Sequence, residues 1–385
     1  MIGSVFAGSV EMIRRTFLKG LTSTPALLAG ADSEGFIPLF DGKSLTGWTV
    51  EEAPPSAFYV QDGAIVVHES CGYPAWLRSK AQYENFEFRG EFFIKGWMDS
   101  GIYLHAPEHG RPTWTGLQMK IFHQEETQPA TNSMGSILPV AAPLKVNVRN
   151  KGEWNVFRIL MDWPSLRIWT NGEQIQDLNL ESNPELRRRL RSGYLGLTSL
   201  SYPIRFRNLR IRELPSKEKW QSLYEGPPDL GKWFVSEGKP KFDPLGEVLW
   251  ADGTGHLATT EKFRDFELQL YVRASKEHNS GILFRTSGEG LKGRHYEIQL
   301  HNVEDAHYPT GSLYTLKRSV YPRIEDEKWF PMQLIVQGKN CLVRINGDTV
   351  MEYDRLDNLE EGSIELQAHR PGRWTEFKHI RVKRL

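Results

Sequence analysis

Cysteine is nearly absent from this chain. Only Cys71 and Cys341 occur among 385 residues, and they fall in opposite halves. Two such isolated thiols argue against a disulfide framework and against a thiolate metal site. An excess of charge is also missing, because Lys plus Arg and Asp plus Glu both number 48. With no net field to draw the protein to nucleic acid or to an anionic membrane, we expect a small neutral partner.

Long apolar runs are missing as well. No segment approaches the ~20 residues that a membrane-spanning helix needs, so we expect no membrane span. Residues 1–31 follow a pattern of their own, in which Arg14 and Arg15 precede a modestly apolar run and the triplet AGA ends it. This order predicts a twin-arginine-type export signal and a periplasmic or extracellular protein. An ordinary amphipathic helix is the alternative, and translation begins at either Met1 or Met12.

Helical periodicity is scarce, and several catalytic motifs are absent. There is no Gly-rich phosphate loop, no GxSxG elbow and no paired Cys motif. One short helix is expected at 181–190, with Asn183 as its cap and Pro184 in its first turn. Most other segments are short, rich in β-branched and aromatic residues, and separated by Gly and Asn-Gly turns, which is typical of strands.

The chain contains the same unit twice. FIPLFDGKSLTGW near the start is echoed by WQSLYEGPPDLGKW, and DSGIYLH by NSGILFR. Seventeen positions separate Trp154 from Asn171, and the same number separates Trp329 from Asn346. We therefore predict two domains, at 36–214 and 215–385, joined near RELPSKEKW.

This strand density predicts an all-β fold in each half. About 175 residues of short strands cannot bury their apolar faces as one sheet, whereas two packed sheets can. The expectation is two tandem jelly-roll sandwiches with short helices only.

Six motifs in order carry a family resemblance. They are FxxLFDGKSLxGW, NSGIxxR, YExQ, GSLY, a Trp-led strand pair that ends in NG, and FRNLRIREL. Together they resemble the family once called domain of unknown function 1080, now described as the 3-keto-disaccharide hydrolase domain. The resemblance covers nearly all of residues 36–385 and implies a concanavalin A-like lectin and glucanase sandwich.

The strand HYEIQLHN, residues 295–302, is the main candidate for a site. Glu297, Gln299 and His301 alternate with apolar residues and so share one face of the strand. With the preceding Arg285, Glu297 and His301 are the candidate catalytic residues. The candidate substrate-binding residues are Gln299, Asn279, Tyr314, Lys317, His307 and Tyr296.

The first half differs at these positions. Aligned by sequence, Gly116 stands opposite Glu297, and His105 stands opposite Arg285. The C-terminal half is therefore expected to carry the chemistry. A second candidate face in the first half comprises Tyr103, His105, Trp114 and Gln118.

The chemistry is expected to differ from that of ordinary glucanases. Those enzymes use two carboxyl groups, whereas the residue four positions after Glu297 is His301. A 3-keto sugar offers another route, in which a base removes the proton at C2, the glycosidic oxygen leaves C1 and water adds. Glu297 or His301 is the base, Arg285 or Lys317 the electrophile, and Tyr314 or His307 the acid. A structural Glu297–Arg285 ion pair is the alternative for those two residues.

Other functions stay open at this stage. The chain could be a non-catalytic carbohydrate-binding protein, or a scaffold for protein partners, because fold alone does not decide function. No cofactor or metal is predicted. His105 and His109 are separated by Pro107, and Asp99, Asp305 and Asp326 offer oxygens for calcium without a recognisable ligand spacing.

Overall fold

The computed structural model describes residues 32–68, 75–123, 128–199 and 203–385. The predicted export signal at 1–31 lies outside these ranges. Nearly all regular structure is β, so the predicted all-β class is confirmed. The helical elements are α1 (Pro112–Thr115) and the 3-10 turns η1 (Pro55–Ala57), η2 (Pro227–Lys232) and η3 (Gly290–Lys292).

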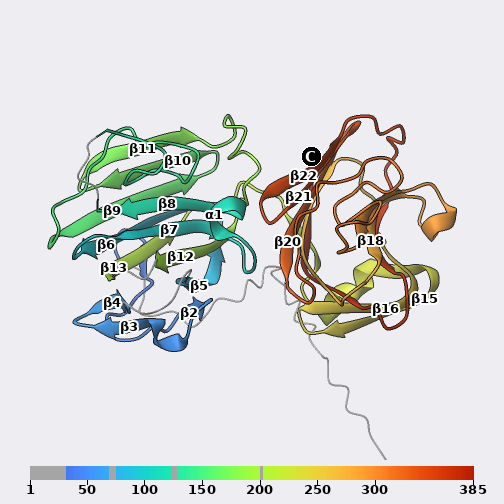
Figure 1. The fold of residues 1–385 in the computed structure, drawn as a ribbon, viewed down its shortest axis with the longest axis horizontal. Coiled ribbons are helices and arrows are strands. Elements are labelled where there is room, and N and C mark those ends of the chain that lie inside the picture. The colour runs from blue at the N-terminus through green and yellow to red at the C-terminus, as the bar shows by residue number, and fades with distance from the viewer. Residues whose placement is uncertain (1–31, 69–74, 124–127, 200–202) are drawn as a thin grey trace, which may run out of the picture.

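Strands β1–β13 form two sheets, which we call the N-terminal repeat (Figure 1). The first sheet has the order β11 (Glu173–Asn179), β10 (Ser165–Thr170), β9 (Trp154–Asp162), β6 (Phe86–Ile94), β13 (Ile204–Glu213), β4 (Ala64–Val67) and β3 (Phe58–Gln61), with β1 (Ile37–Pro38) paired to β13. The second has the order β2 (Trp48–Glu51), β5 (Ala75–Tyr83), β12 (Gly193–Ser199), β7 (Asp99–Ala106) and β8 (Leu117–Phe122).

Strands β14–β24 form the C-terminal repeat as one continuous curled sheet. Its order is β19 (Tyr296–Leu300), β18 (Ser280–Thr286), β23 (Ser363–Ala368), β16 (Val248–Thr259), β24 (Thr375–Arg384), β17 (Phe266–Ala274), β20 (Phe330–Gln337), β21 (Asn340–Ile345) and β22 (Asp348–Tyr353), with β14 (Gln221–Tyr224) on β24 and β15 (Trp233–Leu245) on β16. The long strand β16 pairs with β24 in its first half and with β23 in its second half. It therefore joins two layers that are separate sheets in the N-terminal repeat.

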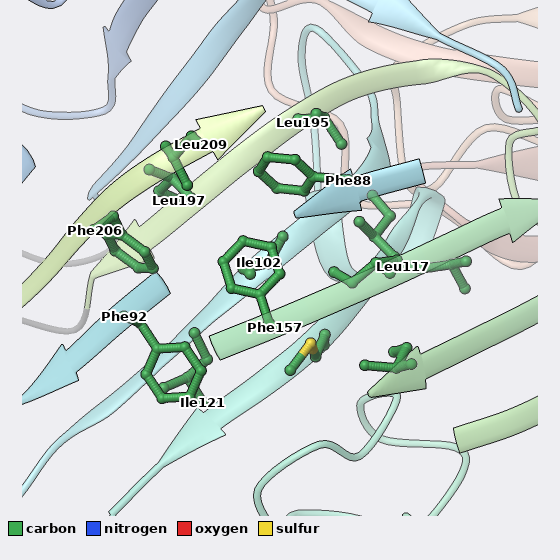
Figure 2. Packing of buried hydrophobic residues seen from close by; sticks show 14 of the residues in the cluster. Phe88, Phe92, Ile102, Leu117, Ile121, Phe157, Leu195, Leu197, Phe206 and Leu209 are labelled. Carbon is green, nitrogen blue, oxygen red and sulfur yellow. The ribbon is translucent and has the colours of Figure 1, made fainter. Parts of the chain in front are cut away.

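Each repeat has its own apolar core between its layers. In Figure 2, aromatic rings of the first sheet, such as Phe88 and Phe157, face Ile102, Leu117 and Ile121 of the second sheet. Because strand side chains alternate, the neighbours of these apolar residues on β7 and β8 point away from the core. Glu297 and Gln299 in the C-terminal repeat, and Tyr103 and Gln118 in the N-terminal repeat, lie on such outward faces.

The turns follow the sequence in most places. Asn171 and Asn346 have φ values of 50° and 52°, and each precedes a glycine that also has positive φ, as a type I′ hairpin turn requires.

The predicted helix at 181–190 is wrong. Asn183 accepts hydrogen bonds from the amides of Glu185 and Leu186 as a cap would, but the segment forms turns. Among the described residues, no helix is long and apolar enough to span a membrane.

Candidate active site

Strand β19 separates apolar from polar residues as its alternation predicts. Ile298 and Leu300 lie in the core of the C-terminal repeat, whereas Glu297 and Gln299 point to the opposite side of the sheet. The register with β18 places Leu283 opposite Glu297 and Gly281 opposite Gln299. This outward face is nevertheless closed to bulk solvent, because Glu297 is only 6% exposed.

The carboxyl group of Glu297 lies over Gly281. A Cβ atom added to Gly281 would stand 2.2 Å from Oε1 of Glu297, so any larger residue at 281 would displace the carboxyl from this position. Burial raises the pKa of Glu297 to about 7, and the nearby His256 opposes this rise only in part. The group therefore changes between acid and base near neutral pH.

A second carboxyl group, which sequence reasoning missed, lies across β18. Leu283 pairs with Glu297 on one side and with Glu365 of β23 on the other. Glu365 is fully buried and accepts hydrogen bonds from the hydroxyls of Thr286 and Ser236. Burial pushes its pKa upward, but hydrogen bonds from His256, Thr286 and Ser236 outweigh burial and hold the pKa below 4.5.

The sequence does contain a signal for this pairing. Residues 297–301 read EIQLH and residues 365–369 read ELQAH, so both strands carry Glu, Gln and His at alternate positions. Both strands are antiparallel to β18 and therefore run in the same direction. The two rows thus flank β18 in matching order, with Gly281 and Leu283 between them.

His256 of β16 extends this polar face. Its Nδ1 lies 3.1 Å from Oε2 of Glu365, and its Nε2 lies 3.3 Å from the side-chain nitrogen of Gln367. In the neighbouring row, Gln299 donates a 2.7 Å hydrogen bond to Oδ1 of Asn279. The expected grouping of Asn279, Gln299 and Glu297 on one face is thus present, with His256 and Glu365 added.

Three more histidines lie at the end of the two rows. His278 is fully buried, its Nδ1 lies 3.0 Å from the carbonyl of Ser275, and burial lowers its pKa to about 4. Burial, together with the nearby His369, also lowers the pKa of His301. These imidazoles are therefore held toward the neutral form, in which they can accept protons.

Arg285 does not belong to this face, and the alternative of a structural Glu297–Arg285 ion pair is wrong, because Arg285 pairs with Asp265. Arg285 has a φ of 50°, and its fully buried guanidinium turns away to donate to the carbonyls of Arg264, Asn358 and Gly338 and to Asp265. The sequence could not reveal this turn, because a strand without the irregularity would present Arg285 beside Glu297.

His105 is the counterpart of Arg285 in the N-terminal repeat. It has a φ of 51°, and its ring nitrogens contact the carbonyls of Leu190 and Glu84. Both residues have a positive φ at equivalent positions of β7 and β18, and both form hydrogen bonds to backbone carbonyls of neighbouring loops. Their difference is a structural substitution and says nothing about which repeat is active.

Tyr296 also lies outside the face. Its ring stacks on Phe284 in the core at 5.3 Å, and its hydroxyl contacts Asp357 and Asn358. Tyr314, Lys317 and His307 lie on the loop after β19, where the amide of Tyr314 donates to the backbone carbonyl of Glu297. Lys317 lines a separate surface pocket with Arg318 and Tyr321, and the rings of Tyr314 and His307 both pack on Tyr308.

The register also corrects the alignment of the two repeats. Tyr103 pairs with Gln118 as Leu283 pairs with Glu297, so Gln118, not Gly116, is the counterpart of Glu297. Backbone hydrogen bonds support this alignment. The carbonyl of Gln118 accepts a hydrogen bond from the amide of Leu138, and the carbonyl of Glu297 accepts one from the amide of Tyr314. The sequence alignment was displaced by two residues. A two-residue shift keeps every side chain on the same face of the strand, so the polar and apolar alternation does not reveal it.

The second candidate face is only partly assembled. Tyr103 and Gln118 are cross-strand partners on the outward face of the N-terminal repeat. His105 is buried, as described above. Trp114 lies at the contact between the repeats, beneath Arg111, which forms an ion pair with Asp348.

A cleft of about 1100 Å³ with a mixed polar and apolar lining lies between the repeats. Within the described residues, Glu108, Glu247 and His379 at this cleft could hold a metal ion by distance alone. The ammonium group of Lys378 lies 2.8 Å from Glu108 and 3.9 Å from Glu247, so a cation already neutralises these carboxylates. The cluster therefore has the properties of an ion-pair network that joins the repeats.

Comparisons with known proteins give the family. The model of the 3-keto-alpha-glucoside-1,2-lyase-like domain matches the chain twice, at residues 35–212 and 219–383. A 3-keto-disaccharide hydrolase of Bacteroides thetaiotaomicron is 32% identical over 85 residues, which cover 20% of this chain and 29% of that protein, less than a third of its length.

Two solved structures are also similar. A Parabacteroides distasonis protein assigned to the glycosyl hydrolases shares 23% identity, covering 47% of this chain and 95% of that one with a TM-score of 0.42. The β-glucanase of Bacillus licheniformis shares 10%, covering 45% and 100% with a TM-score of 0.33. The two matches to the family model span most of the residues, and the chain therefore belongs to the 3-keto-alpha-glucoside-1,2-lyase-like domain family, as a tandem repeat of that domain.

Proposed function

We propose that the C-terminal repeat cleaves glycosidic bonds of 3-keto-glycosides by elimination followed by hydration. The observation that carries this proposal is the arrangement around β18. A carboxyl group with a pKa near 7 lies over a glycine, and an anchored carboxylate–imidazole pair lies on the next strands. A general base is most effective when its pKa is near the working pH.

Glu297 is the base in this mechanism. The ketone at C3 acidifies the hydrogen at C2, and the Glu297 carboxylate takes that proton while the electron pair moves into the C3 carbonyl to form an enolate. The enolate then re-forms the ketone as the C1–O bond breaks, and the leaving oxygen takes a proton from the incoming water molecule. The hydroxide of that water adds at C1 of the resulting C1=C2 bond, and Glu297 returns its proton to C2.

The side-chain amide of Gln367 is the donor in this mechanism, in place of the Arg285 or Lys317 of the sequence-based hypothesis. Nδ1 of His256 donates to Glu365, so Nε2 of the same ring accepts from the amide nitrogen of Gln367 and orients it. The second N–H of this amide can stabilise the negative charge that develops on the substrate oxygen. Glu365 and His256 act through Gln367 and are positioning residues.

The second carboxyl group raises a competing possibility, ordinary inverting hydrolysis. In that mechanism a carboxylic acid and a carboxylate lie about 6.5 to 9.5 Å apart, and one of them activates water. Glu297 and Glu365 are two strands apart, which corresponds to about 9 to 10 Å at the backbone. However, Glu365 is fully buried and already accepts three hydrogen bonds, so it has little capacity to bind and activate a water molecule.

The test is cleavage of matched substrates. We expect release of free sugar from 3-keto-disaccharides and none from the unoxidised parents, because only the ketone acidifies C2. Cleavage of the parents with inversion at C1 would instead support the inverting hydrolase. Binding of both sugars with no turnover would contradict the enzyme and support the carbohydrate-binding alternative.

A further inference from the structure

The N-terminal repeat lacks the acid–base groups of the C-terminal repeat. The strand registers match the two outward faces position by position. The residues Glu297, Glu365, His256, His278 and His301 of the C-terminal repeat correspond to Gln118, Gly196, Trp76, Met98 and Phe122 of the N-terminal repeat. Amide, aromatic and apolar groups thus replace every titratable group in this set.

The aromatic residues of the N-terminal repeat fill the space that the carboxyl of Glu365 occupies in the C-terminal repeat. Trp76 and Tyr103 pack edge to face at 5.4 Å above Gly196. A Cβ atom on Gly196 would stand 2.6 Å from the ring of Trp76 and 2.8 Å from that of Tyr103. The face therefore has no room for a counterpart of Glu365, and acid–base catalysis of the kind proposed above is excluded there.

One rim of this face presents an aromatic plane to solvent. Trp97 is 52% exposed, and it is the one exposed tryptophan of the twelve, all of which lie in the described part of the chain. Its ring is fixed by Phe122 at 6.0 Å and by His123 at 5.1 Å. The ring of His123 is itself fixed, because its Nδ1 accepts a 3.0 Å hydrogen bond from the amide of Met98. An aromatic plane held in this way loses little conformational entropy when a ligand stacks on it.

Charged groups flank the plane. Nζ of Lys120 lies 2.5 Å from both carboxylate oxygens of Asp99, whose side chain remains 21% exposed. The same cross-strand position in the C-terminal repeat holds the uncharged pair Asn279 and Gln299. The Asp99–Lys120 pair offers acceptors and donors with no net charge, which suits the hydroxyl groups of a neutral sugar and not an ionic ligand.

We propose that Trp97, Asp99, Lys120, Phe122 and His123, the Trp97 rim, form a non-catalytic binding site for a neutral pyranoside. The apolar face of the sugar ring stacks on Trp97, and its hydroxyls bond to Asp99 and Lys120. The ligand class rests on the proposed carbohydrate function, but binding at the rim requires no cleavage. The N-terminal repeat then holds one part of a saccharide while the C-terminal repeat carries out the chemistry.

The experiment measures binding of maltose, cellobiose and methyl α-glucoside to the full-length protein by isothermal titration and saturation-transfer NMR. We expect Trp97→Ala to weaken binding of at least one probe by about 10-fold, the usual scale of an aromatic contact. The matched control is Tyr59→Ala, which removes a 40%-exposed ring of the same repeat on β3, in the other sheet, and is expected to leave affinity unchanged.

Two further variants separate this proposal from the enzymatic one. The double variant Asp99→Asn, Lys120→Gln installs the uncharged pair of the C-terminal repeat and is expected to weaken binding without loss of fold. Glu297→Gln is expected to abolish turnover of 3-keto sugars and to keep binding at the rim. Equal affinities of the wild type and Trp97→Ala would overturn the proposal, as would loss of all probe binding in Glu297→Gln or no binding of any probe by the wild type.

Discussion

Glu297 combines burial with the absence of a cationic partner. Its carboxyl is packed over Gly281, and no described residue forms an ion pair with it, since Arg285 turns away. Burial without a compensating charge is the condition that raises the pKa of a carboxyl group toward neutrality. Residues of this kind are concentrated at functional sites.

The pH dependence of turnover tests the role of Glu297. If its carboxylate is the base, kcat/KM for a 3-keto-disaccharide rises with pH through an apparent pKa of about 7. Glu297→Gln is expected to lower turnover by at least ~100-fold and to remove this limb of the profile. A Gln variant that keeps both the rate and the limb would show that another group is the base.

The pH dependence of stability tests the same carboxyl without substrate. Because its folded pKa lies above the unfolded value of 4.5, the folded state binds the proton more tightly, and stability falls as pH rises from about 4.5 through about 7. Glu297→Gln removes this loss, so above pH 7 we expect the variant to be more stable than the wild type by up to about 3 kcal/mol. Urea unfolding at pH 5 and pH 8 provides the comparison. A destabilised variant at pH 8 would indicate that Glu297 makes favourable contacts as an anion.

At the scale of elements, the irregularity of β18 at Arg285 occurs in both repeats. Arg285 and its counterpart His105 both leave the strand with positive φ and bond to the turn before the preceding long strand. In this way one side chain connects β18 to three loops, and the loop carbonyls are satisfied without water. The outward face of each repeat is therefore held by residues that do not take part in it.

Arg285→Met is expected to lower the free energy of unfolding by about 3 to 5 kcal/mol, because it leaves the buried carbonyls and Asp265 without their hydrogen-bond donor. The measurements are urea unfolding and kcat of the fraction that remains folded, with the exposed Arg355→Met as a control. We expect kcat of folded Arg285→Met to stay within a few-fold of the wild type. A stable variant without activity would return Arg285 to the catalytic group.

At the scale of the whole molecule, an ionic network joins the repeats. Glu108 of the N-terminal repeat contacts Lys378 and His379 of β24, and its amide donates to the hydroxyl of Tyr271. Glu225 adds a second carboxylate to His379 at 2.6 Å. The network closes one side of the cleft between the repeats.

His379 makes this network sensitive to pH. Burial alone would lower its pKa, but Glu108 and Glu225 outweigh burial and raise the pKa to about 9. The stabilisation is complete below the unfolded pKa of 6.5 and is lost as pH rises through about 9. We expect His379→Gln to cost about 2 kcal/mol at pH 6 and little at pH 10. Thermal unfolding at the two pH values tests this, and an equal cost at both would contradict it.

Export concerns the whole molecule as well, although residues 1–31 lie outside the described ranges. The twin-arginine pathway reads Arg14 and Arg15 as a pair, so changing both to Lys is expected to retain the precursor in the cytoplasm. Cell fractionation with detection of the processed form is the measurement. Normal export and processing of the double variant would show that the signal was misread.

The sequence by itself determined the duplication, the all-β class and the polar row on β19, because these depend on local alternation and on spacing along the chain. It did not determine the turn of Arg285 out of its strand, the two-residue shift between the repeats, or the unwinding of 181–190, where Arg189 bonds to the carbonyl of Thr113. Nor did it identify Glu365 as the partner of Glu297, although both strands carry the same E-x-Q-x-H pattern. These features were decided by tertiary structure, since hydrogen-bond register and buried polar contacts join residues that are remote in sequence and leave no local periodicity.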